Sequence, residues 1–175
     1  MNRVFAVTVN NHSGVLNRIT GLFLRRGFNI QSITVGATET DGISRMTIVL
    51  NVDDERDTEQ VVKQLHKQID VLKVQDITEA PIVARELVLI RVNSPLTTRS
   101  ELTTLIGPFR ASIIDVSRDS VTIQAVGSPE KVEALIFLLQ PYGIKELART
   151  GVTAVLRAND AAELSRSSRN YVLSI

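Results

Sequence analysis

The sequence has no cysteine and no tryptophan, and aromatic residues make up only 4% of its 175 residues. Without cysteine there can be no disulfide bridge, no thiolate metal ligand and no cysteine nucleophile. Few aromatic rings leave few surfaces on which bases or sugars could stack. No apolar run approaches the roughly 20 residues that a membrane-spanning helix requires. The core is therefore expected to be aliphatic, and the protein is expected to have no membrane partner.

An excess of charge of one sign is also absent. The sequence contains 20 Lys and Arg residues and 19 Asp and Glu residues, which gives a formal net charge of +1. This balance gives no electrostatic attraction to nucleic acid or to an anionic membrane. The first residues, M-N-R-V-F-A-V, already have the pattern of a strand and lack the charged and apolar regions of a signal peptide. We therefore expect a cytoplasmic protein with no nucleic-acid partner.

The first half of the chain has the element order β-α-β-β-α-β. Apolar residues at positions 15, 16, 19, 22 and 23 have the spacing of an amphipathic helix, which Gly27 is expected to end. Asp57 and Gln60 have the spacing of a capping box ahead of a second helix. Strands are predicted at residues 3–9, 28–38, 44–52 and 72–78, the second and third joined by a turn that contains Gly42.

The same order of elements follows in the second half, after a short linker at residues 79–81. Thr98 with Glu101, and Ser128 with Pro129, predict the starts of two helices. Strands are predicted at residues 86–92, 112–116, 121–126 and 144–149. This order is the split βαβ arrangement of ferredoxin-like folds. We expect an α+β protein with two ferredoxin-like units, residues 1–78 and 79–158, and a tail at residues 159–175 that is poorly ordered without a partner.

Residues typical of catalytic or metal sites are sparse. The only histidines are His12 and His66, and although Ser13 lies beside His12, sequence neighbours rarely face each other as a catalytic triad requires. The acidic residues 53–55 could hold a cation such as Mg²⁺, but such a run between a strand and a helix is more often a solvated loop. Neither G-x-x-x-x-G-K nor G-x-G-x-x-G occurs. We therefore expect no catalytic and no metal-binding residue.

The polar stretch N-N-H-S-G-V-L, residues 10–16, joins the first predicted strand to the first predicted helix. The start of a helix presents free N–H groups and the positive end of its dipole, which suit a carboxylate. Gly14 would let a ligand approach the backbone, and the Asn11 amide can both donate and accept hydrogen bonds. Asn and Ser are also favoured helix caps, and for this stretch alone capping is the simpler interpretation.

A series of short motifs then narrows the interpretation. They are N-H-S-G-V-L-N-R at residues 11–18, G-L-F at 21–23, R-G-F-N-I at 26–30, S-I-T-V at 32–35, S-R-M-T-I at 44–48, K-Q-L-H-K at 63–67 and D-V-L at 70–72. In the second half, F-R at 109–110, I-I-D-V at 113–116 and R-T-G at 149–151 follow. Together they resemble an ACT domain and, more narrowly, the regulatory (small) subunit of acetolactate synthase, also called acetohydroxyacid synthase, over residues 1 to about 157.

The resemblance implies an N-terminal ACT domain, a C-terminal ferredoxin-like domain and no catalytic chemistry in this chain. It implies a subunit that activates the catalytic subunit of acetolactate synthase and confers feedback inhibition by valine in branched-chain amino acid biosynthesis. Thiamine diphosphate, Mg²⁺ and FAD would belong to the catalytic partner, and this chain would hold no cofactor. The resemblance also implies a homodimer formed through the ACT domains.

Valine is expected to bind between the two chains of that dimer. By motif, the site residues are Asn11, Gly14, Val15 and Leu16 of one chain and Asn29 and Ile30 of the other. Asn11 and Asn29 would hold the polar ends of the ligand, and the backbone N–H groups near Gly14 and Val15 would hold its carboxylate. Aliphatic side chains would surround the isopropyl group.

Two other functions fit parts of the sequence. A free-standing ACT-domain sensor of another amino acid, acting on a different enzyme or regulator, would share the ACT motifs. It would leave the motifs at residues 109–116 and 149–151 unexplained. A small ferredoxin-like enzyme of the acylphosphatase type would show turnover without a partner, but the sequence offers it no convincing site.

Overall fold

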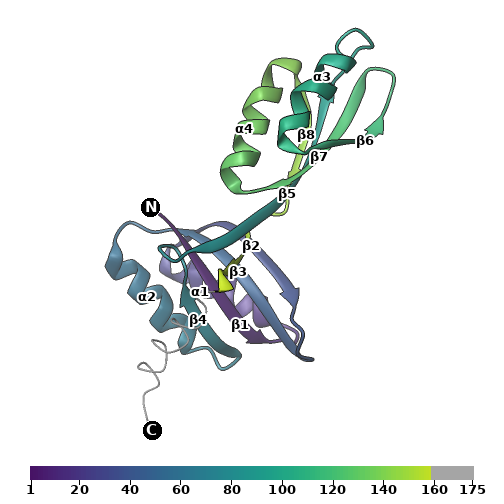
Figure 1. The fold of residues 1–175 in the computed structure, drawn as a ribbon. Helices are drawn as coiled ribbons and strands as arrows, with labels where there is room; N and C mark the ends of the chain where they lie inside the picture. The colour runs from purple at the N-terminus through teal and green to yellow at the C-terminus, as the bar shows by residue number, and fades with distance from the viewer. Residues whose placement is uncertain (159–175) are drawn as a thin grey trace. The chain divides into compact units, whose positions relative to one another are not determined.

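The computed structural model describes residues 1–158, which form two compact units (Figure 1). The first unit is Met1–Val83 together with the described residues from Ala154 on, and the second is Ala84–Thr153. The tail predicted at residues 159–175 lies outside the described residues. None of the helices within residues 1–158 is both long and apolar enough to cross a membrane.

The first unit is a four-stranded antiparallel sheet with two helices, in the predicted order. Its strands are β1 (Asn2–Asn10), β2 (Asn29–Ala37), β3 (Ile43–Asn51) and β4 (Val71–Asp76), and its helices are α1 (Val15–Arg26) and α2 (Glu55–His66). The strand order across the sheet is β2-β3-β1-β4. Strands β2 and β4 are therefore the edges, and β1 and β3 lie at the centre. This is the ferredoxin-like arrangement, which confirms the predicted fold class.

The core of the first unit is aliphatic, with two phenylalanines. Because side chains alternate between the faces of a strand, Phe5, Val7 and Val9 of β1 all point to the same face of the sheet. Both helices place their apolar stripes on that face, with Ile19 of α1 and Leu65 of α2 fully buried. One helix end follows the prediction, since Gly27 adopts a φ of 73° and Phe28 N–H donates to the Phe23 carbonyl at 3.0 Å.

The predicted start of α2 is wrong by three residues. The cap is Asp54, whose carboxylate accepts a hydrogen bond from Asp57 N–H at 2.9 Å, and the helix begins at Glu55. Asp57 in turn accepts from Asp53 N–H at 3.4 Å. Asp54 and Asp57 thus form hydrogen bonds with backbone N–H groups where α2 begins.

A short strand that the sequence did not reveal, β9 (Thr153–Leu156), pairs with β5 (Ile82–Asn93). Ala154 lies on the face of the first sheet that the helices leave open. Its N–H donates to Thr47 Oγ1 at 3.3 Å, and its carbonyl accepts from Arg45 Nη2 at 3.2 Å. Burial lowers the pKa of Arg45. The sequence places residues up to 158 in the second unit. In the structure, the described residues from Ala154 on belong to the first unit.

The second unit repeats the first. After β5 come α3 (Arg99–Ile106), β6 (Ser112–Val116), β7 (Ser120–Gly127), α4 (Pro129–Leu139) and β8 (Ile144–Arg149), with short 3₁₀ turns at Gly107–Phe109 and Gln140–Tyr142. The strand order is β6-β7-β5-β8. Ser128 caps α4 as predicted, accepting from Lys131 N–H at 3.4 Å. Thr98 precedes α3 as predicted, but its hydroxyl donates to the Pro95 carbonyl, so the predicted capping box is wrong.

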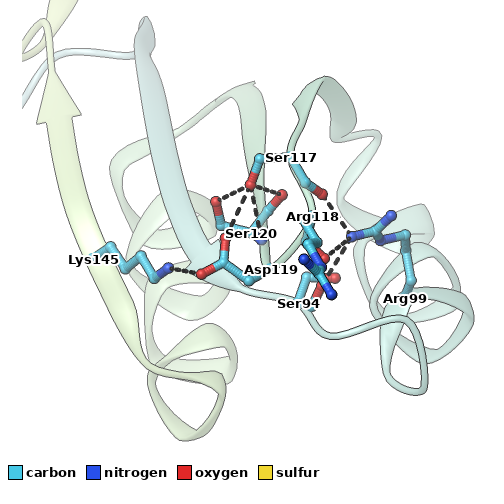
Figure 2. A network of polar contacts seen from close by, with 7 residues as sticks. All are labelled: Ser94, Arg99, Ser117, Arg118, Asp119, Ser120 and Lys145. Atoms are coloured by element: carbon cyan, nitrogen blue, oxygen red, sulfur yellow. Dashed lines mark hydrogen bonds and ion pairs between the residues drawn. The ribbon is translucent and has the colours of Figure 1, made fainter.

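A polar network joins the loops at one end of the second unit (Figure 2). Arg99, the first residue of α3, donates from Nη2 to three backbone carbonyls. They belong to Ser94, Ser117 and Arg118, at 3.0, 2.9 and 3.3 Å. Lys145 Nζ of β8 lies 3.2 Å from Asp119 Oδ2, and its hydrogen bond holds the pKa of that carboxyl below the usual value. The arginine thus connects the start of α3 to the loops that contain Ser94 and Ser117 through backbone carbonyls.

Candidate functional site

The loop at residues 11–14 connects the end of β1 to the start of α1. Its first residues are fixed through the backbone: Asn10 N–H donates to the Asp70 carbonyl at 2.9 Å, and Asn11 N–H to the Gly42 carbonyl at 2.7 Å. Gly14 immediately precedes the helix and has a φ of 88°, in the left-handed region that favours glycine. A Cβ at Gly14 would meet no atom within 4 Å, so the space beside this backbone is open.

The start of α1 lacks a side-chain cap. No side chain within residues 1–158 accepts a hydrogen bond from the first turn, so the capping role considered for this stretch is wrong. The amides of Leu16 and Asn17 belong to that turn and have no intrahelical acceptor. Val15 is buried in the core, whereas Leu16 is 44% exposed. The helix therefore presents free N–H donors beside an open glycine and an exposed aliphatic side chain.

The other predicted site residues lie at the opposite end of the sheet. In the strand register Asn29 faces Asn51, as does Asn2 at the start of β1, while Asn10 faces Ile43. Nine-residue β1 thus separates Asn29 from the loop by about 26 Å, at roughly 3.3 Å per residue. One chain does not bring Asn11 and Asn29 together. A site built from both requires two chains.

Asn29 lines a polar hollow at its end of the sheet. The hollow has a volume of about 400 Å³ and is lined by Arg26, Gly27, Phe28, Asn29, Asn51, Val52, Asp53 and Asp57. Ile30 is partly buried against the core. Both residues belong to edge strand β2, whose register shifts between Ile30 and Ser32, as at a β-bulge. Bulges are frequent on edge strands and beside functional sites.

Both units match models of known protein families. Residues 5–73 match the family model described as the AHAS small subunit-like ACT domain, and residues 85–158 match the model described as the small subunit of acetolactate synthase. The acetolactate synthase small subunit of Bacillus subtilis is 58% identical over 175 residues, which is 100% of this chain and 99% of the relative. This chain belongs to the acetolactate synthase small subunit family. The family resemblance of the sequence is thereby confirmed.

Other members of the acetolactate synthase small subunit family agree in sequence and in structure. A probable acetolactate synthase small subunit of Archaeoglobus fulgidus is 55% identical, over 91% of this chain and 99% of the relative. The crystal structure of the acetolactate synthase small subunit from Thermotoga maritima superposes with a TM-score of 0.82 at 42% identity, covering 90% of this chain and 98% of that chain. A free-standing ACT sensor would not account for the family match of residues 85–158.

The structure adds one residue to the candidate site that the motifs alone did not single out. Asp70, just before β4, has a side chain only 8% exposed, with Arg18 Nη2 at 2.5 Å and His12 Nδ1 at 3.3 Å. The only signal in the sequence is its place at the start of the D-V-L motif. His12 is thus a partner of Asp70. Within residues 1–158, no three His, Asp or Glu side chains are grouped so that they could hold a metal ion.

Proposed function

We propose that this chain is the regulatory subunit that activates the catalytic subunit of acetolactate synthase and confers feedback inhibition by valine. It would act in the cytoplasm in branched-chain amino acid biosynthesis, while thiamine diphosphate, Mg²⁺ and FAD would reside in the catalytic partner. Family membership supports the pairing with a catalytic subunit. The observation that carries the effector site is the uncapped start of α1 beside Gly14.

A free amino acid matches the donors at this loop. The valine carboxylate would accept hydrogen bonds from the first-turn amides of α1, where the helix dipole also favours a negative charge. The Asn11 side chain would hold the polar end, and Leu16 would contact the isopropyl group. Such hydrogen bonds contribute about 1.5–3 kcal/mol each, and burial of a valine side chain about 1.5–3 kcal/mol. After the cost of association, the expected affinity lies between about micromolar and millimolar.

A homodimer through edge strand β2 would complete the site. Strands β1 and β2 both run antiparallel to β3, so they point the same way and start at the same end of the sheet. Antiparallel pairing of β2 with its copy would invert the second chain. Asn29 of one chain would then lie at the same end of the joined sheet as the partner's loop 11–14. This symmetry supports the proposed division of the site between two chains.

A site shared between two chains can also regulate. Valine bound across the dimer would favour one arrangement of the two chains over others. If the catalytic subunit binds the valine-free arrangement more tightly, valine weakens activation, and the catalytic subunit weakens valine binding by the same factor.

The test measures acetolactate formation by the catalytic subunit with and without this chain, over a range of valine concentrations. Wild-type chain is expected to raise the rate, and valine to reverse the increase. Asn29→Ala is expected to activate normally but to lose inhibition by valine. Asn93→Ala, which removes an exposed strand-end asparagine in the second unit, is the control and should behave as wild type.

Two results would contradict the proposal at different levels. No change of rate on adding wild-type chain would refute the regulatory function. Undiminished inhibition of Asn29→Ala by valine would refute the site while leaving the function.

A further inference from the structure

Asp70 contacts three consecutive parts of the candidate effector region. Its backbone carbonyl accepts from Asn10 N–H, at the last residue before loop 11–14. Its carboxylate oxygen Oδ1 contacts His12, inside the loop, and Oδ2 contacts Arg18, one turn into α1. The segments before, within and after the candidate effector loop are therefore all attached to Asp70.

Stability alone does not account for a charge at this position. Removing a carboxylate from water is costly, and replacing a buried ion pair with apolar residues is often neutral or stabilising. The Asp70 side chain is only 8% exposed, and its two oxygens contact His12 in the loop before Gly14 and Arg18 in the helix after it. What these two contacts provide is a fixed position of the loop relative to the start of α1.

We propose that Asp70 is a positioning residue for effector binding, holding loop 11–14 in the conformation that receives the amino-acid ligand. The inference rests on the proposed function, because it assigns Asp70 to the same valine site. Asp70 does not touch the ligand. Its carboxylate keeps the open Gly14 and the free amides of α1 in place before the ligand arrives, so that ordering the loop does not weaken binding.

The test is calorimetric titration of the full chain with valine, for Asp70→Asn, Arg18→Gln and the double variant. Asp70→Asn keeps the shape of the side chain and the backbone carbonyl but removes the charge that holds Arg18. Each single variant is expected to weaken the Kd for valine by about tenfold. The double variant should be no weaker than the weaker single variant, because both changes remove the same contact.

A separate readout distinguishes positioning from a general structural role. The chain concentration that half-activates the catalytic subunit should change less than about twofold in the two single variants, since the second unit and the dimer edge are untouched. Glu59→Gln, which breaks the exposed pair between Glu59 and Lys63 on α2, is the matched control and should change neither quantity.

Three outcomes would overturn the inference. One is a wild-type valine Kd in both single variants. The second is a double variant in which the two losses multiply, since independent effects would mean that no shared contact exists. The third is a parallel loss of valine binding and activation, which would mark Asp70 as structural. Should Asp70→Asn fail to fold, Arg18→Gln still tests the contact, because the Arg18 side chain is 51% exposed. Absence of valine binding by wild-type chain would instead refute the proposed function.

Discussion

At the scale of single residues, Gly14 decides the shape of loop 11–14. Its φ of 88° lies where a side chain meets its own backbone, and only glycine adopts this conformation without strain. The loop therefore turns into α1 without a capping side chain; Val15 N–H donates to the His12 carbonyl at 3.3 Å, and the amides of Leu16 and Asn17 are left available. Gly14 thus allows the turn into α1 and keeps the backbone open for the proposed ligand.

Gly14→Ala is expected to destabilise the chain by about 1–2 kcal/mol, because alanine is strained at this φ. Valine binding should weaken as the loop shifts. Gly21→Ala is the matched control: Gly21 lies inside α1, where alanine fits with an ordinary 3.4 Å contact to Arg25 and should stabilise by about 0.5–1 kcal/mol. Urea unfolding of both variants measures the difference. Equal stability of Gly14→Ala and wild type would show that the loop has no need of glycine.

At the scale of elements, the sequence predicted the order of both βαββαβ units but not every element end. Apolar spacing and Gly27 predicted α1 correctly, since these signals are local. The start of α2 was misplaced because residues 53–57 contain several carboxylates that could cap a helix, and the sequence does not show which one faces the free amides. Strand β9 was missed because its four residues carry no long pattern. Strand β9 forms by pairing with β5, which is distant in the sequence.

The candidate site also contains residues that the sequence predicts and residues that only the structure reveals. The motifs named Asn11 and Gly14, and the structure shows open, uncapped backbone there. The contacts of Asp70 could not be predicted, because His12 and Arg18 are more than fifty positions away and meet it only in the folded chain. The assignment of Asn29 and Ile30 depends on a second chain and stays a prediction.

The attachment of β9 to the first unit depends on the buried hydroxyl of Thr47. Thr47→Val keeps the shape but leaves Ala154 N–H without its acceptor, which should cost about 1–3 kcal/mol. Hydrogen exchange at Ala154 should become faster. Thr122→Val is the control, because its hydroxyl makes only a 3.5 Å bond to Arg91 and its loss should be nearly neutral. Unchanged exchange at Ala154 in Thr47→Val would show that other contacts hold the strand.

At the scale of the whole molecule, the proposed regulation depends on association of two chains through edge strand β2. A strand edge presents unpaired backbone donors and acceptors, which a second copy can satisfy. Val35 of β2 is 47% exposed, an apolar side chain at the proposed interface. If the site is divided between chains, any change that separates the chains must also remove valine binding.

Val35→Glu is expected to convert the dimer to a monomer and to abolish valine binding, because the two-fold axis brings a charge to each side of the interface. Sedimentation velocity measures the first effect and calorimetry the second. Val126→Glu, on β7 of the second unit and 49% exposed, is the control and should stay dimeric. A Val35→Glu chain that remains dimeric would show that the chains associate through another surface.

The most direct test of the valine site is calorimetric titration of the purified chain alone with valine, with glycine as the comparison. Saturable heat from valine, with a midpoint between about micromolar and millimolar, and none from glycine is the expected result. Glycine offers the same charged ends but no side chain to bury. A dimeric chain that takes up no valine at millimolar concentration would contradict the proposal that this small subunit carries a valine site.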